Sequence, residues 1–274
     1  DWRRRNCHGC PCEDFEVPVV RLIVADIGGT NARFAVSAQG EPSLRHITHL
    51  RCADFVGFED AFERFLTGLP CDEQSSHHLL SLAVAGPVNE QIVDVSNNHW
   101  RFDKTRLLER LALDKLLVIN DFTAQALAQH NAADGDRRQI LDGIEDASAP
   151  LLVIGPGTGL GVSALIPVVH GPLPVEGEGG NIRFAPQNAP ERDLCAYMEQ
   201  QTDHVVVEHF VSGPGLENIH RFLANSAGIE PSLSAEMIAT SALREEGICR
   251  DAVNLMIGIL LSLIHISEPT RLDD

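Results

Sequence analysis

The chain has 274 residues, and 44% of them are hydrophobic, which is enough to bury one substantial core or two modest ones. Its formal net charge of -18, from 21 basic and 39 acidic residues, disfavours nucleic acid and anionic lipid as partners. No apolar run of membrane-spanning length and no signal peptide is apparent, and seven irregularly spaced cysteines are typical of a reducing compartment, so we expect a cytoplasmic protein.

The chain opens with DWRRRNCHGCPCEDFE, which has no hydrophobic period and contains no Met. We therefore interpret residues 1–16 as a non-native or disordered extension, translated from before the true start. The alternative is a metal site built from Cys7, Cys10 and Cys12. Three thiols without a clear fourth ligand are a weak zinc signal, so the extension is the preferred interpretation.

The first half of the chain predicts strands, with one early helix. Arg21–Ile27 is a short run rich in β-branched residues, and Gly28 and Gly29 separate it from a second strand at Ala32–Ser37. A stripe of aromatic residues then predicts an amphipathic helix through Phe55, Phe58, Phe62, Phe65 and Leu66. Further strands are expected at His46–Arg51, Leu79–Ala85, Gln91–Val95 and Lys115–Asn120.

Two helix starts are marked by capping residues. Asp103 can cap a helix that runs to about Leu113, and Thr123 can cap the helix that follows the strand at Lys115–Asn120. We expect the domain boundary in the same region, near 121–123, although no hinge composition marks it.

The opening pattern recurs in the second half. Leu151–Ile154 leads into the glycine-rich run Gly155–Gly161 and then into another apolar strand, VSALIPV. Helices are expected afterwards at Arg192–Gln201, Gly215–Ala224 and Ala235 to about Leu260. Strand, glycine turn, strand near the start of each half favours a mixed α/β protein of two related halves with a cleft between them.

The sequence at the end of the chain indicates a segment that is not native to the protein. Leu261–Arg271 reads LSLIHISEPTR, which matches one translation frame of a transposon-derived sequencing adapter at eleven consecutive residues. The alternative is a native helix end that matches by coincidence. We expect the native sequence to end near Leu260 and interpret residues 261–274 as an adapter-like tail.

The first glycine turn can bind phosphate. A strand delivers Asp26 to its end, and the glycines at 28 and 29 let the backbone approach an anion closely. Thr30 adds a hydroxyl, and the Asp26 carboxylate can hold Mg²⁺ through water. The alternative is an ordinary hairpin turn with an acidic neighbour.

The second turn strengthens the phosphate hypothesis. Four glycines alternate within Gly155–Gly161, which weakens a strand unless a ligand approaches its backbone, and Thr158 offers another hydrogen bond. The run lacks the Lys and Ser or Thr of a Walker A motif and the spacing of a dinucleotide fingerprint. Two such turns facing one cleft suit a nucleotide held between two domains.

Further polar residues could serve a sugar hydroxyl. Asn120 and Asp121 lie where a strand ends and a helix begins, so the carboxylate is placed to accept a hydroxyl proton, with helix capping as the alternative. Sugar sites also collect side chains of the kind found at Glu178, Glu208 and Asn97. On loops such residues are more often simply solvated.

These motifs resemble those of a known family. DIGGTNARF, Asp26–Phe34, is similar to the first phosphate motif of bacterial glucokinases, in the actin-like and hexokinase-like kinase superfamily. The similarity continues in the family's order through VSNNHW, INDFTA, GPGTGLGV, GEGGNIRFAP and VSGPGLENI. Together these runs span about Leu22–Leu260, which makes the combination specific.

The resemblance implies an α/β, actin-like (ribonuclease H-like) two-domain sugar kinase, with ATP and sugar in the interdomain cleft. The domains would be residues 17–122, with the first phosphate motif, and 123–260, with the second. Asp121 would take the proton from the 6-hydroxyl of glucose, giving glucose 6-phosphate. ATP phosphates, and Mg²⁺ through Asp26, would bind at Asp26, Ile27, Gly28, Gly29, Thr30, Asn31, Gly157, Thr158 and Gly159. The sugar would bind at Asn97, Asn120, Asp121, Glu178, Asn181 and Glu208.

Two departures from the family pattern qualify this expectation. Family members usually carry His at the position of Asn181, so the choice of sugar could differ. The motif that cradles adenosine should follow the helix near Leu260, and it is absent with the rest of the C-terminal part, so we expect weak ATP binding and impaired activity. The alternatives are a kinase for another hexose or an N-acylated amino sugar, or a non-catalytic sugar-binding or regulatory protein. The family is often homodimeric.

Overall fold

The computed structural model describes residues 21–37, 43–70, 78–88, 90–130, 132, 134–144, 146–230, 233–244 and 246–267. The expected extension at 1–16, with Cys7, Cys10 and Cys12, lies outside these residues, as does the end of the expected tail from 268 onward. The chain divides between Asp121 and Phe122 into two compact units, called unit 1 and unit 2 below.

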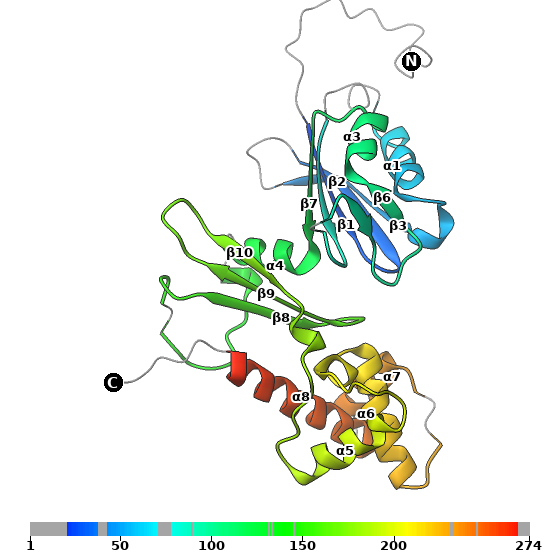
Figure 1. The fold of residues 1–274 in the computed structure, drawn as a ribbon, viewed down its shortest axis with the longest axis vertical. Helices are drawn as coiled ribbons and strands as arrows, with labels where there is room; N and C mark the ends of the chain where they lie inside the picture. Colours follow the sequence, from blue (N-terminus) through cyan, green and yellow to red (C-terminus); the bar gives the residue numbers. More distant parts are fainter. Residues whose placement is uncertain are drawn as a thin grey trace, which may run out of the picture. The chain divides into compact units, whose positions relative to one another are not determined.

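Unit 1 is built on a five-stranded sheet with the order β3-β2-β1-β4-β7 (Figure 1). The strands β1, β2 and β3 form an antiparallel meander, and β1, β4 and β7 run parallel to one another. A two-stranded ribbon, β5 with β6, and the short 3-10 turn η2 complete the β structure and its connections. The bounds are β1 Arg21–Ile27, β2 Asn31–Ser37, β3 Leu44–Arg51, η2 Cys52–Asp54, β4 His78–Val84, β5 Ile92–Asp94, β6 Arg101–Asp103 and β7 Lys115–Asn120.

Two helices, α1 (Phe58–Thr67) and α3 (Lys104–Arg110), pack on this sheet (Figure 1). Alternate strand residues such as Ile23 and Leu82 are buried with the aromatic stripe of α1, as period-2 strands and a 3.6-residue helix require. The rings of Phe34 and Phe65 stack with centroids 5.3 Å apart. The predicted strands and aromatic helix are therefore present, although α1 begins at Phe58 and the prediction that Phe55 lies in it is wrong. Their shared core makes the sheet a rigid base for the loops at its ends.

One of the two predicted helix caps is present and the other is not. Asp103 caps α3 by accepting a hydrogen bond from the Arg106 backbone N–H at 3.0 Å, but the helix ends at Arg110, short of the predicted end. Helix α4 (Asp121–His130) begins at Asp121, so Thr123 lies inside its first turn and the prediction that it caps the helix is wrong.

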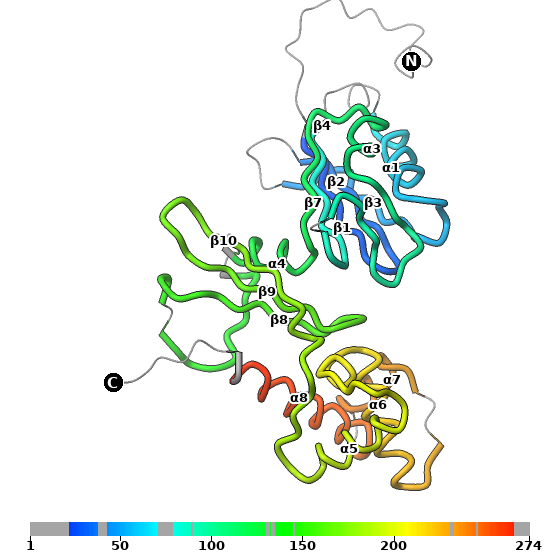
Figure 2. Tube along the Cα trace, in the orientation of Figure 1, coloured from blue at the N-terminus to red at the C-terminus, as the bar shows by residue number. Residues whose placement is uncertain are grey.

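Unit 2 contains a three-stranded antiparallel sheet, β10-β9-β8, and a group of helices that Figure 2 traces from green to red. Helices α6, α7 and α8 pack together around apolar residues that include Phe210, Ile219 and Ile259. The remaining bounds are η3 Asp134–Asp136, β8 Leu151–Pro156, β9 Leu160–Ile166, β10 Leu173–Gly177, η4 Gly179–Asn181, α5 Ala189–Glu199, η5 Val207–His209, α6 Gly213–Ser226, α7 Ala235–Arg244 and α8 Ile248–Ser267.

The long helix predicted from Ala235 to about Leu260 is two helices. α7 ends at Arg244 and α8 begins at Ile248, with Gly247 between them at a φ of 133°. Such a backbone conformation is open to glycine and interrupts a helix. α8 continues past Leu260 to Ser267, and Leu263 is buried in the unit 2 core. Whether residues 261–274 are adapter-derived stays a prediction.

Helix α8 also corrects the expectation about apolar runs. By length and composition, and within the described residues, the stretch Ile248–His265 could cross a membrane, with a mean hydropathy of 1.5. The charges of Arg250 and Asp251 interrupt the apolar run without lowering the mean hydropathy enough to exclude it. Core helices of globular proteins pass the same test. Ala252, Ile259 and Leu263 of α8 pack into the unit 2 core, but only 17% of the stretch is buried.

Candidate active site

One edge of the unit 1 sheet gathers the first set of predicted site residues. The parallel register pairs Ile27 with Val84, and Val84 with Asn120, so β1, β4 and β7 end side by side. The chain leaves this edge at the first glycine turn, at Gly86 and at Asp121. Open α/β sheets bind their ligands beyond the carboxyl ends of parallel strands, so the fold itself favours this edge as a site.

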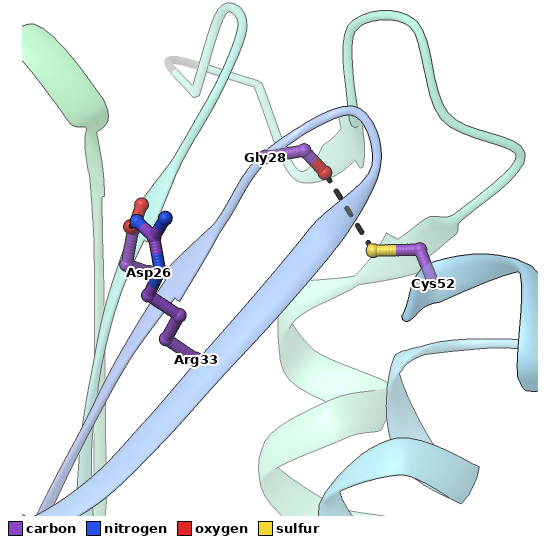
Figure 3. A network of polar contacts seen from close by, with 4 residues as sticks. All are labelled: Asp26, Gly28, Arg33 and Cys52. Carbon is purple, nitrogen blue, oxygen red and sulfur yellow. Dashed lines mark hydrogen bonds and ion pairs between the residues drawn. The ribbon is translucent and has the colours of Figure 1, made fainter. Parts of the chain in front are cut away.

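Side chains of unit 1 hold the first glycine turn in place. The Gly28 N–H donates to the Asn31 carbonyl at 2.9 Å and closes the turn. The Gly28 carbonyl accepts from Asn98 Nδ2 at 3.0 Å, and the Cys52 thiol lies 3.7 Å from it (Figure 3). Burial raises the pKa of that thiol, so Cys52 stays a neutral donor. The Thr30 carbonyl also accepts from the Cys52 N–H at 2.9 Å, so hydrogen bonds within unit 1 fix the shape of the turn.

The first turn also touches a predicted sugar residue. A Cβ at Gly29 would come within 3.1 Å of the Asn97 Cβ and carbonyl oxygen, closer than most real contacts. Asn97 has a φ of 56°, a left-handed conformation that asparagine tolerates better than most residues. Glycine at 29 therefore allows the predicted phosphate turn and the predicted sugar segment to lie against each other.

Asp26 is paired with an arginine that the sequence analysis did not single out. Arg33 Nη1 lies 2.7 Å from Asp26 Oδ2, and both side chains are about half exposed (Figure 3). The pair joins opposite residues of β1 and β2. No group of three or more His, Cys, Asp or Glu close enough to hold a metal ion occurs among the described residues. One exposed carboxylate fits Mg²⁺, which usually keeps its waters and shares substrate phosphates.

Asn120 and Asp121 lie at the same edge and are half-buried. Asn120 Nδ2 donates to the Gly86 carbonyl at 3.2 Å, which ties the end of β7 to the end of β4. Gly86 has a φ of 120°, and a Cβ there would lie 2.7 Å from Ser96 Oγ, so the residue must be glycine. Asp121 opens α4 directly after this tie, so its carboxylate is carried by a fixed strand end.

A hollow of about 440 Å³ adjoins the first turn, within the size range of small-molecule sites. Its lining includes Gly29, Thr30 and Asn97 from the predicted set. The other lining residues were not predicted from the sequence, and only the repeated asparagine in VSNNHW could have indicated one of them, Asn98. These residues are Arg51, Cys52, Ala53, Asn98 and His99.

The second glycine turn belongs to unit 2 and is built differently. The Gly157 N–H donates to the Gly159 carbonyl at 2.7 Å, and the Gly157 carbonyl accepts from the Gly213 N–H at 2.8 Å. The Leu160 N–H, directly after the turn, donates to Glu208 Oε2 at 2.7 Å. Glu208 comes from η5, so the structure brings it to the turn although the two are 48 residues apart.

The alternating glycines of the second turn do not all serve a ligand. A Cβ at Gly161 would overlap the ring of Phe122 at 1.9 Å, and one at Gly155 would lie 3.1 Å from the same ring. At Gly159 a Cβ would meet Glu208 Oε2 at 2.6 Å. Only Gly157 has open space, with nothing nearer than 4.0 Å. The interpretation of the whole run as a ligand approach is thus too broad.

Glu178 and Asn181 are brought together within their own segment. Asn181 Nδ2 donates to Glu178 Oε2 at 3.3 Å, and both side chains are exposed. Between them, a Cβ at Gly180 would lie 2.5 Å from the Leu160 carbonyl oxygen and 3.2 Å from Glu208 Oε2. The predicted sugar segment of unit 2 therefore packs against the end of the second turn.

A model of the protein family described as Glucokinase matches residues 23–264. The chain belongs to the glucokinase family. The glucokinase of Aromatoleum aromaticum is 38% identical over 247 residues, which cover 88% of this chain and 73% of the relative. This membership makes the chain a hexose kinase, a phosphotransferase.

Solved structures agree on the fold. A glucokinase from an Antarctic psychrotroph is similar with a TM-score of 0.72 and 29% identity, covering 88% of this chain and 76% of that one. A ROK family glucokinase from Streptomyces griseus, in complex with glucose and AMPPNP, has a TM-score of 0.59 and 20% identity, covering 90% and 80%. The chain thus has the actin-like, two-domain sugar kinase fold that its motifs predicted.

Proposed function

We propose that the chain transfers the terminal phosphoryl group of ATP to the 6-hydroxyl of glucose, giving glucose 6-phosphate. Membership of the glucokinase family supports this reaction, and a structural relative carries glucose and AMPPNP. The observation that carries the proposal is the sheet edge of unit 1, where the first glycine turn and Asp121 follow the ends of β1 and β7, and where Asn97 lies against Gly29.

In this proposal Asp121 is the general base that accepts the proton of the attacking hydroxyl. Its place after a tied strand end supports the role, because a base must be held in position to act on one hydroxyl. Asn97 and Asn120 would hydrogen-bond the sugar from unit 1. Glu178, Asn181 and Glu208 would do so from unit 2, and the carboxylates would orient hydroxyl groups by accepting hydrogen bonds from them.

The two glycine turns would hold the nucleotide phosphates. The segments 26–31 and 157–159 carry the hydroxyls of Thr30 and Thr158, and the open space at Gly157 leaves room for an oxygen to approach the backbone. Asp26 would bind Mg²⁺ through water, and bound Mg²⁺ would neutralise phosphate charge. That role matters here because the net charge of -18 repels a nucleotide.

We also propose that the nucleotide and the sugar each bind residues of both units and that the reaction takes place in the cytoplasm. The predicted residues support the first point, because both the proposed phosphate residues and the proposed sugar residues are divided between unit 1 and unit 2. Seven irregularly spaced cysteines, typical of a reducing compartment, support the second.

Transfer of labelled phosphate from ATP to a panel of sugars tests the proposal. The panel holds glucose, other hexoses and N-acylated amino sugars, each assayed with the wild-type chain and with Asp121→Asn as the blank. We expect glucose to be the best acceptor, with product above the blank at a rate that weak ATP binding keeps low. A better acceptor elsewhere in the panel would reassign the substrate. Sugar binding without any transfer would support a regulatory protein of the same fold.

A further inference from the structure

Glu208 is the point in unit 2 where two proposed ligand segments converge. A Cβ added at Gly159, in the second turn, would lie 2.6 Å from Glu208 Oε2, and one added at Gly180 would lie 3.2 Å from the same oxygen. Gly159 belongs to the proposed phosphate turn and Gly180 to the proposed sugar segment. Both segments therefore approach one carboxylate oxygen, and glycine at each position makes that approach possible.

The same oxygen holds the backbone where the second turn ends. Leu160 is the first residue of β9 and is buried, so its N–H needs a partner inside the protein. Glu208 Oε2 accepts that hydrogen bond at 2.7 Å. Bonds to an ionised acceptor are shorter and stronger than neutral ones, so this contact fixes the end of the turn more firmly than a carbonyl acceptor would.

Glu208 is itself fixed by the start of α6. Its carbonyl accepts from Ser212 Oγ at 2.8 Å, and the same Ser212 side chain caps α6 by accepting from the Gly215 N–H at 2.9 Å. The next residue, Gly213, donates its N–H to the Gly157 carbonyl. One short segment thus holds both ends of the turn, through the backbone at Gly157 and through the Glu208 side chain at Leu160.

We propose that Glu208 is a positioning residue for the turn Gly157–Gly159 in addition to its proposed contact with the sugar. Oε2 fixes the turn through the Leu160 N–H, and Oε1 serves the sugar hydroxyl. Nucleotide and sugar then depend on one side chain, so a change at Glu208 affects nucleotide binding even when no sugar is present. The sugar half of this inference rests on the proposed function, and the contact with the turn does not.

Two substitutions at Glu208 separate the two roles. Glu208→Gln keeps an acceptor oxygen for the Leu160 N–H but places an amide donor where the sugar would meet Oε1. Glu208→Ala removes both. Glu178→Ala is the matched control, because Glu178 is also a proposed sugar carboxylate, and it accepts its hydrogen bond from Asn181 within its own segment rather than from the turn.

Amide hydrogen exchange of the ligand-free chain reads the turn directly. We expect Glu208→Ala to speed exchange of peptides spanning 157–162 by about tenfold and to weaken AMPPNP binding without sugar by about the same factor, the loss of one hydrogen bond. Glu208→Gln exchanges the ionised acceptor for an amide oxygen, so it should affect both quantities about two- to threefold, clearly less than Glu208→Ala, and raise the KM for glucose about tenfold. Glu178→Ala should raise the KM for glucose alone.

Unchanged exchange and unchanged AMPPNP affinity in Glu208→Ala would overturn the proposal, as would equal loss of AMPPNP affinity in the Gln and Ala variants. Peptides from α1 in unit 1 report global unfolding. If Glu208→Ala unfolds, Gly159→Ala tests the proposal in its place, because the added Cβ displaces the Glu208 carboxylate without removing it. This variant should speed exchange at 157–162. A wild-type chain that prefers another sugar would refute the proposed substrate, and the exchange result would still decide the role of Glu208.

Discussion

The two glycine turns share a sequence pattern, but the structure supports them by different means. The first turn lies at the end of a central strand of a five-stranded sheet, and neutral side chains, Asn98 and Cys52, hold its Gly28 carbonyl. The second lies at the tip of a β-hairpin, and a charged side chain and a helix start hold it. The sensitivity of each turn to mutation therefore depends on what packs against each of its glycines.

The largest expected effect tests whether the chemistry depends on unit 1. Asp121→Asn removes the proposed base without changing its size, and the rate of glucose phosphorylation at saturating substrates should fall by about 10²–10⁴. The midpoint of thermal unfolding should change little, because Asp121 is only half-buried at the start of α4. A steady-state assay measures the rate.

Asp114→Asn is the matched control for this prediction, since Asp114 is an exposed aspartate directly before the opposite end of β7. Its rate should stay within about twofold of wild type, as for most exposed substitutions. If Asp121→Asn kept most of its activity, Asp121 would be a helix-start residue rather than the base.

The next largest effect is the loss of stability when a side chain is added to a glycine that packs against protein rather than facing a ligand. Gly161→Ala forces a Cβ to within 1.9 Å of the Phe122 ring, and overpacking of this kind destabilises a protein by about 1–3 kcal/mol. Gly28→Ala is the contrasting variant, since its nearest neighbour would be at 3.6 Å. Urea unfolding measures both.

The double variant Phe122→Ala with Gly161→Ala supplies the control, because it removes the ring that the new methyl group strikes. The loss of unfolding free energy in this double variant should be smaller than the sum of the losses in the two single variants. Equal stability of Gly161→Ala and wild type would mean that Phe122 does not pack on that strand.

Gly157 allows a test of ligand approach alone. Its surroundings have room for a methyl group, so Gly157→Ala should leave the unfolding free energy nearly unchanged. If phosphate oxygens approach the backbone there, the methyl group obstructs them and the KM for ATP should rise about tenfold. Gly143→Ala, with nothing within 4 Å, is the control and should change neither quantity. An unaltered KM for ATP in Gly157→Ala would remove Gly157 from the phosphate site.

Local patterns in the sequence predicted much of this fold, because they depend on neighbours in the chain. The repeated strand–turn–strand and the aromatic stripe of α1 are of this kind. The contact of Glu208 with Leu160 spans 48 residues and left no periodic signal. The reason for glycine at 161 is a ring at 122, and a run of glycines does not reveal which of them meet protein. The break at Gly247 was missed because a single glycine is tolerated in many helices.

The smallest expected effect concerns the ion pair between Asp26 and Arg33. Because both side chains are about half exposed, a double-mutant cycle with Asp26→Asn and Arg33→Leu should give a coupling energy below about 1 kcal/mol, reduced further by salt. Urea unfolding at low and high ionic strength measures it. A weak pair means that the fold does not require Asp26 to be an aspartate, so a large fall in activity of Asp26→Asn would reflect the proposed Mg²⁺ contact. A coupling energy above about 2 kcal/mol, unchanged by salt, would instead make Asp26 a structural residue of β1 and remove the reason for placing the metal there.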